Sequence, residues 1–268
     1  MAELISNAEK FADEARNLTL FKNFSLPGVK DKVSAILNMI GRVEGIFSTY
    51  TIHSIEHVDE MLKSLDWLVP PDTQKAMTCV DWLLVVLAIY LHDLGMVVTS
   101  DEYKKRMENH KFAEFLEDIQ TNPTNKDYMA RVERIEGEYR DRFFYQEYIR
   151  MHHATRIREL IHGRSTGQWG ETIKPVFDEI ADIMRELPPR FRENLGNVCE
   201  SHHADNLDKR EYFPLHQHYG GAEEASANVQ YAALMLRTAD LLHVTKDRTP
   251  SVMYKILGLS DPKSLSEN

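Results

Sequence analysis

The stretch Trp82–Asp93 reads WLLVVLAIYLHD, and it decides the fold. The apolar run Trp82–Leu91 is roughly half as long as a membrane span, so it predicts a buried core helix. That helix ends on the polar pair His92 and Asp93. Because an isolated buried carboxylate is costly unless it is paired or bound to a metal ion, the pair predicts a metal site at the end of the helix.

Outward from this stretch, the pattern remains helical and the alternation typical of strands is scarce. The sequence therefore predicts an all-α fold. Pro27-Gly28 is expected to separate the first helix from the second, and Gly137 is expected to break a long charged helix. Residues 204–221 are expected to be irregular. The main expected helices with assigned bounds span residues 6–18, 29–48, 127–161 and 222–244. Two further helices are expected between the second and the third of these, one that carries His57 and one that ends at Asp93.

Composition narrows the class of protein. The 268 residues suffice for one large domain or one domain with an insertion. The formal net charge of −10 disfavours general binding of nucleic-acid backbones, which relies on Lys and Arg. Cys79 and Cys199 form no disulfide framework, and the N-terminus lacks the pattern of a signal peptide. We therefore expect a cytoplasmic protein with no membrane association.

Histidine and aspartate residues elsewhere supply partners for the His92-Asp93 pair. His57 precedes it, and Asp240 follows it within the otherwise apolar run Ala239–Leu242. Helical bundles build metal sites from facing helices, so sequence separation is no obstacle. The other candidate ligands are His53, His152, His153, His202 and His203.

The order His, His-Asp, Asp on an all-α chain resembles the HD superfamily of metal-dependent phosphohydrolases. Three segments carry the resemblance, which covers about residues 50–248: HSIEHV at 53–58, LHDLG at 91–95 and ADLL at 239–242. It implies an HD-domain helical bundle with helical insertions. The expected organisation is an N-terminal helical extension at 1–28, the HD domain at 29–258, and a polar tail or linker to a missing C-terminal domain at 259–268.

The additional histidines resemble a histidine-rich, dinuclear subgroup of HD enzymes. In that subgroup Asp93 would bridge two ions, His153 and His202 would hold the second ion, and His203 would bind a further ion or the substrate. The resemblance thus implies catalytic roles for Asp93, His153 and His203, with His57, His92 and Asp240 as further metal ligands.

Three choices between neighbouring histidines stay open. His57 is preferred over His53 because it follows an acidic residue and precedes an apolar one, as the family ligand often does. Adjacent helical residues point about 100° apart, so His152 and His153 cannot both face one ion. We favour His153, and likewise His202 over His203.

The chain departs from the HD branch that cleaves cyclic dinucleotides. Met96 occupies the position where that branch often has Lys, and Tyr212-Phe213-Pro214 stands where a Gly-Tyr-Pro element is expected. These differences argue against a cyclic di-GMP substrate.

The expected chemistry is hydrolysis of a phosphoester or phosphodiester bond by metal-activated water, an EC 3.1 activity on a nucleotide or small phosphorylated substrate. His-rich ligation favours one or two ions of Mn, Fe, Ni, Co or Zn over Mg. Cationic or hydrogen-bonding groups suited to the substrate phosphate are Arg150, Arg156, Lys246 and His216.

Two alternative functions remain at this point. One is a metal-dependent single-strand nuclease, which makes nucleic acid the second-choice partner. The other is a nucleotide-sensing HD regulatory module attached to a partner domain, and a homo-oligomer is compatible with either.

Overall fold

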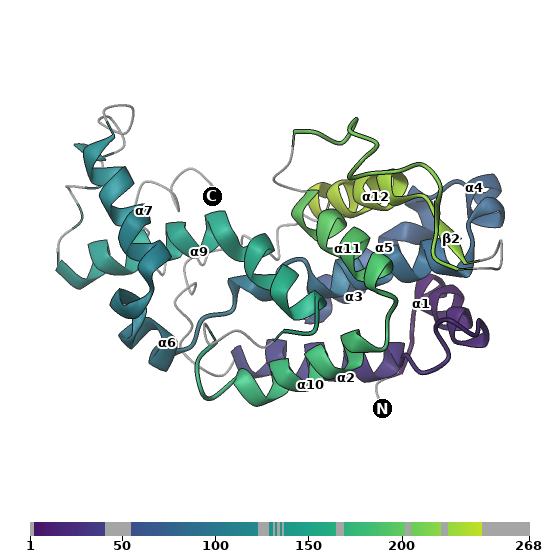
Figure 1. The fold of residues 1–268 in the computed structure, drawn as a ribbon, viewed down its shortest axis with the longest axis horizontal. Coiled ribbons are helices and arrows are strands. Elements are labelled where there is room, and N and C mark those ends of the chain that lie inside the picture. Colours follow the sequence, from purple (N-terminus) through teal and green to yellow (C-terminus); the bar gives the residue numbers. More distant parts are fainter. Residues whose placement is uncertain are drawn as a thin grey trace.

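The computed structural model describes residues 3–40, 55–122, 129–130, 132, 135, 137–164, 169–201, 205–220 and 225–242 (Figure 1). This part of the chain is predominantly helical, as the sequence predicts. In chain order the elements are α1 Asn7–Asp13, η1 Glu14–Asn17, α2 Leu26–Ile40, α3 Ile55–Leu68, α4 Pro71–Ala76, α5 Cys79–Leu91, η2 Leu94–Met96, α6 Ser100–Lys104, η3 Arg106–Glu108, α7 His110–Thr121, α9 Gly137–Ile161, α10 Lys174–Arg185, α11 Pro189–Glu200, β1 Gln217–His218, β2 Ser226–Ala227 and α12 Val229–Leu242.

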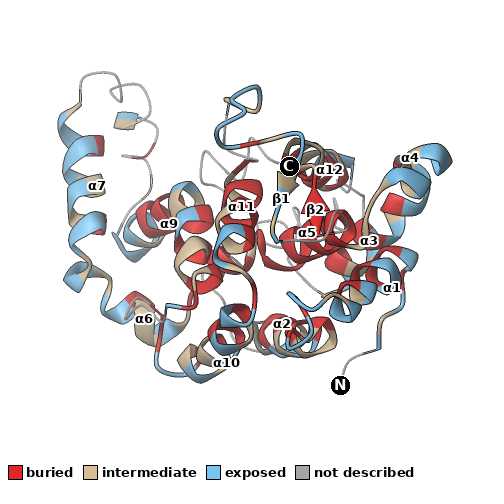
Figure 2. Ribbon diagram, turned by 45° about the vertical axis from the view of Figure 1, so that its right-hand side comes forward, coloured by how far each residue is buried: buried red, intermediate tan, exposed pale blue. Residues whose placement is uncertain are grey.

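Helix α5 is the centre of the fold. Thr78 caps its first turn and exchanges hydrogen bonds with Asp81 in a capping box. Every residue from Val80 to Leu91 is buried, because α1, α3, α11 and α12 pack around this helix (Figure 2). The window Cys79–Met96 is long and apolar enough to cross a membrane, yet 89% of it is buried inside the chain. The predicted core helix is therefore confirmed.

The described residues form two hydrophobic cores. The larger core surrounds α5 and includes side chains from α1, α2, α3, α10, α11 and α12. A smaller core joins α6, α7 and the first half of α9, with Phe112, Phe143 and Tyr145 at its centre. Figure 1 shows this second group of helices projecting to one side of the bundle.

Some expected boundaries differ in the structure. Pro27 and Gly28 do not interrupt a helix but lie in the first turn of α2, where the Oγ of Ser25 accepts a hydrogen bond from the backbone N–H of Gly28 at 3.1 Å. Proline is tolerated in a first turn because its missing N–H has no intrahelical acceptor there. Residues 217–218, in the segment expected to be irregular, pair in antiparallel fashion with residues 226–227. The latter fall in the helix expected at 222–244, and α12 begins only at Val229.

A buried carboxylate joins α1 to the central helices. Glu9 is fully buried, and its Oε2 accepts hydrogen bonds from the backbone N–H groups of Ile5 at 2.7 Å and Ser6 at 2.8 Å. Its Oε1 accepts from the hydroxyl of Tyr90 on α5 and forms an ion pair with Lys30 on α2 at 2.7 Å. One side chain thus holds three helices together, and Tyr90 lies two residues before His92.

Candidate metal centre

Four predicted ligands come together from three helices. His57 lies on α3, His92 and Asp93 follow the last turn of α5, and Asp240 lies on α12. One ligand atom from each residue lies within 4.8 Å of the others. The Nε2 of His92 is 3.0 Å from Oδ2 of Asp93 and 3.9 Å from Oδ1 of Asp240, and the Nε2 of His57 is also 3.9 Å from that oxygen. The arrangement is compact enough for one cation.

The two imidazoles are buried, whereas the two carboxylates reach solvent. The side chains of His57 and His92 are 4% and 1% exposed, and those of Asp93 and Asp240 are 18% and 30% exposed. The Nδ1 of His92 lies 3.0 Å from the carbonyl of Ile89, which leaves Nε2 for the cluster. The centre therefore has a fixed histidine side and an open carboxylate side that a substrate can approach.

The electrostatics of the cluster favour positive charge. Burial alone would lower the pKa of His92, but the carboxylates of Asp93 and Asp240 outweigh burial and raise it to about 9. A site that attracts a proton so strongly attracts a cation for the same reason. Two imidazole nitrogens and two carboxylate oxygens suit Mn, Fe, Co, Ni or Zn. The residues present therefore fit a divalent transition metal.

His153 extends the cluster along α9. Its Nε2 is 3.8 Å from Oδ1 of Asp93, while its Nδ1 lies 2.7 Å from the carbonyl of Arg150. The two oxygens of Asp93 therefore face different histidines, since Oδ2 faces His92. A carboxylate shared by two ions needs this arrangement. His152 instead stacks near Tyr148 on another face of the helix, so His153 is the member of the pair that faces Asp93.

The comparison with protein families agrees with this geometry. A match to the family described as HD-CE covers residues 47–268, which include all five of these side chains. The chain belongs to the HD-CE family. Neither the curated proteins nor the solved structures contain a match. The predicted HD-type domain is thus confirmed. The single HD-CE match contains the His, His-Asp and Asp motifs in the expected order.

Close packing at Gly95 holds His153 beside the His-Asp pair of this HD-CE chain. Gly95 lies in η2, and a Cβ built on it would be 1.9 Å from the carbonyl oxygen of His153. Any larger residue therefore has to push α9 away from η2. The sequence shows Gly95 beside the HD pair, but only the fold reveals that a helix some 60 residues later needs its small size.

We expect Gly95→Ala to destabilise the protein by about 1–3 kcal/mol, the usual cost of forcing an extra group into a packed site. It should also weaken the retention of metal, because His153 moves with α9. Thermal unfolding and elemental analysis measure both effects. Gly220→Ala is the control, since its Cβ would meet only the flexible end of Leu20 at 3.1 Å. Equal stability of the two variants would contradict the close contact.

Several predicted site residues lie outside the described residues: His53, His202, His203 and Lys246. The chain leading to the His202-His203 pair is nevertheless anchored. Helix α11 ends at Glu200, and the carbonyl of Ser201 accepts a hydrogen bond from Nη1 of Arg237 on α12 at 3.1 Å. Arg237 lies one turn before Asp240 on α12, so the residue that holds Ser201 is close in sequence to a ligand of the cluster.

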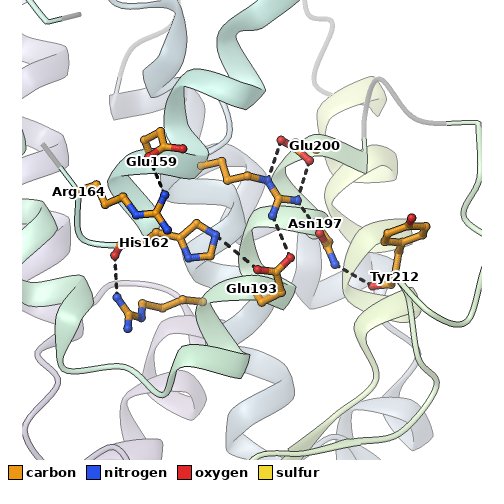
Figure 3. A network of polar contacts seen from close by, with 9 residues as sticks. Glu159, His162, Arg164, Glu193, Asn197, Glu200 and Tyr212 are labelled. Atoms are coloured by element: carbon orange, nitrogen blue, oxygen red, sulfur yellow. Dashed lines mark hydrogen bonds and ion pairs between the residues drawn. The ribbon is translucent and has the colours of Figure 1, made fainter. Parts of the chain in front are cut away.

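A polar network fixes α11 against α9 (Figure 3). Arg158 on α9 donates hydrogen bonds from Nε and Nη2 to the carboxylate of Glu200 at 2.9 and 2.8 Å. It also donates to Glu193 at 3.1 Å and to Asn197 at 2.6 Å. Asn197 in turn donates to the carbonyl of Tyr212 at 3.1 Å. This network therefore fixes α11 against α9, the helix that carries His153.

We expect Arg158→Ala to cost about 1.5–3 kcal/mol of unfolding free energy, because several charge-assisted hydrogen bonds of a largely buried guanidinium are lost. Arg158→Lys should recover only part, since an ammonium cannot bind Glu200 with two parallel bonds. Arg164→Ala, which removes an exposed pair with Glu159 in the same network, should cost less than about 1 kcal/mol. Denaturant unfolding measures all three, and equal losses for Arg158→Ala and Arg164→Ala would contradict the assignment.

The predicted phosphate-binding arginines lie outside the ligand cluster. Arg150 pairs with Glu147 on its own helix, with Nε 3.2 Å from Oε1. Arg156 is buried, donates to Glu102 at 2.8 Å and to the carbonyl of Val97 at 3.3 Å, and covers the ring of Trp169. It lines a cavity that contains none of the clustered ligands. No short-range pattern signals the Glu102 partner, because it lies 54 residues earlier.

His216 is exposed and lies at the opposite end of α5 from the cluster. It precedes β1, which pairs with β2, and the carbonyl of Ser226 in β2 accepts a hydrogen bond from Thr78 at the start of α5. A helix of 13 residues is about 20 Å long, so this hairpin is far from His92. The structure does not bring His216 to the candidate metal centre.

Proposed function

We propose that this HD-CE chain is a metal-dependent phosphohydrolase that cleaves a phosphoester or phosphodiester bond in a nucleotide or small phosphorylated substrate. The observation that carries the proposal is the convergence of His57, His92, Asp93 and Asp240 within 4.8 Å at the end of the core helix. The family match and the donor chemistry support it.

Different residues of the chain would bind the metal ion and transfer protons. His57 and His92 would hold a cation from the buried side, while the more exposed Asp93 and Asp240 would hold it from the substrate side. A bound divalent ion lowers the pKa of water and stabilises the negative charge that develops on phosphoryl oxygens. His153, with Nδ1 fixed by the carbonyl of Arg150, would offer Nε2 to a second ion or to a proton in transfer.

The charge of the chain supports a small substrate over a nucleic acid. The formal net charge is −10, whereas binding along a nucleic-acid backbone relies on many Lys and Arg contacts with phosphate. A small phosphorylated molecule needs only a few local cations in addition to the metal. The single-strand nuclease is therefore the second proposal.

Metal analysis and a substrate panel test the proposal together. The purified chain is assayed for bound Mn, Fe, Co, Ni and Zn, then for hydrolysis of nucleotides, a chromogenic phosphodiester and single-stranded DNA or RNA. We expect metal-dependent turnover of a small substrate that is abolished by a chelator and restored by metal. Degradation of single strands without turnover of any small substrate would favour the nuclease. Nucleotide binding without turnover under every metal would favour a regulatory module.

A further inference from the structure

His216 and His218 are two exposed histidines on either side of Gln217, the first residue of β1. Gln217 is extended and pairs with Ala227 of β2. Because side chains alternate along an extended strand, the residues before and after Gln217 project from the same face. The structure agrees, since the ring centres of His216 and His218 are 4.4 Å apart. Two accessible imidazoles therefore lie side by side on one face of this strand.

The backbone that carries the two histidines is held on both sides. Before them, the carbonyl of Pro214 accepts a hydrogen bond from the backbone N–H of Val229 at 3.0 Å. After them, the backbone N–H of Tyr219 donates to the carbonyl of Ala225 at 2.8 Å, and the Tyr219 hydroxyl accepts from Nδ2 of Asn194 at 3.0 Å. A ligand that binds both rings therefore has little more than two side chains to order.

Both imidazoles are available to a ligand. Within the part of the chain that the structure describes, neither ring forms a hydrogen bond or an ion pair. Gln217 lies on the opposite face of the strand, where its Oε1 accepts a hydrogen bond from Nε of Arg190 at 3.3 Å. The positive charge of Arg190 is thus directed to the face without the histidines. The formal net charge of −10 also favours cations at the surface of this chain.

The separation of the rings suits two ligands of one metal ion. With metal–nitrogen bonds of about 2.1 Å, two imidazoles at tetrahedral or square-planar angles have ring centres about 4.5–5.2 Å apart. The observed 4.4 Å is close to this range, so small rotations of two exposed side chains suffice. Imidazole nitrogens suit Cu²⁺, Ni²⁺ and Zn²⁺ better than Mg²⁺ or Ca²⁺, and Cu²⁺ is expected to bind most tightly.

We propose that His216 and His218 form a second metal site, which binds a late divalent transition-metal ion through two imidazole nitrogens. The site lies at the opposite end of α5 from the candidate metal centre and does not depend on hydrolysis there. Two protein ligands hold an ion less tightly than four, and water fills the remaining positions. The ion at this site should therefore exchange with solvent and leave on dialysis, whereas the metal centre retains its own.

Calorimetric titration of Cu²⁺ into the dialysed, untagged Asp93→Ala chain tests the site. This background lacks the shared carboxylate of the metal centre, so the result is independent of the proposed hydrolysis. We expect His216→Ala and His218→Ala, each added to this background, to weaken Cu²⁺ binding by at least about tenfold, because one imidazole no longer raises the effective concentration of the other. His110→Ala is the matched control, since it removes an 88% exposed histidine from α7 and should leave the affinity unchanged.

Electron paramagnetic resonance of the Cu²⁺-loaded chains identifies the ligands. The Asp93→Ala chain should show two coordinated imidazole nitrogens at the tightest site, and each single-histidine variant should lose this signature. Circular dichroism should be unchanged, because both histidines are exposed and lie outside the helices. Absence of Cu²⁺ binding would overturn the proposal. Unchanged affinity in either variant, or an equal loss in His110→Ala, would also overturn it, because binding would then not require the pair.

Discussion

Asp93→Ala is expected to abolish both metal retention and phosphohydrolase activity. The side chain contacts His92 through Oδ2 at 3.0 Å and faces His153 through Oδ1 at 3.8 Å, so its removal takes away the only carboxylate that both histidines share among the described residues. Residues that merely orient metal ligands already cost 10–100-fold when they are replaced, so loss of a shared ligand should lower metal affinity by at least about 100-fold. Elemental analysis of the purified variant measures the retained metal.

The matched control is Asp72→Ala. Asp72 lies on α4 with its side chain 98% exposed, so this variant removes a carboxylate of the same size and charge from a solvated position. It should retain metal and activity at the level of the unaltered chain. Circular dichroism should show the same helix content in both variants, because Asp93 lies outside α5 and does not cap it. Normal metal content in Asp93→Ala would remove the basis of the proposed function.

Sequence reasoning predicted three ligands of the centre because they interrupt an apolar pattern, whereas the choice of His57 over His53 came from the family resemblance. His92 and Asp93 end an apolar helix, and Asp240 lies in an apolar run, so each needs a compensating partner. Helical periodicity also placed His153 apart from His152, and the fold shows that His153 faces Asp93. These inferences rest on local pattern and on the chemistry of burial, both of which are readable in a sequence.

Long-range partners were not predictable in the same way. Arg156 and Arg158 are two residues apart on α9, yet one packs on Glu102 and the other on Glu200. The charge of Arg156 and its closeness to His153 favoured substrate contact. The tertiary packing of α6 instead places the Arg156 guanidinium in a cavity that contains none of the clustered metal ligands. His216 illustrates the same limit, because the position of a short hairpin depends on Thr78, far away in the sequence.

Glu9→Gln is expected to destabilise the whole protein, although residue 9 lies outside the family match. The substitution keeps the shape but removes the charge opposite Lys30, whose side chain is 5% exposed. Breaking a buried ion pair by neutralising one partner typically costs about 3–5 kcal/mol. Asp59 lies 3.4 Å from Lys30 and compensates in part, so we expect about 3 kcal/mol. The melting temperature should fall by about 6–12 °C. Glu14→Gln, at an exposed position in η1, should change little.

The pH dependence and a double variant identify the cause of that loss. Burial alone would raise the pKa of Glu9, but the contacts with Lys30, Tyr90 and Ser6 hold it below its ordinary value of 4.5. A carboxylate with a lowered pKa stabilises the fold fully above that value and loses this contribution as the pH falls through the lower one. The difference between the unaltered chain and Glu9→Gln should therefore shrink below about pH 4.5.

The double variant Glu9→Gln/Lys30→Met should be more stable than Glu9→Gln alone, because it no longer buries an unmatched ammonium. Denaturant unfolding of the two single variants and the double variant measures the coupling between these side chains. Additive losses would show that residue 9 acts only through its hydrogen bonds to the first turn of α1. A double-variant loss smaller than the sum of the single losses would show that the ion pair between Glu9 and Lys30 holds α1 and α2 together. Tyr90 joins that pair to α5, the helix that ends in the metal centre.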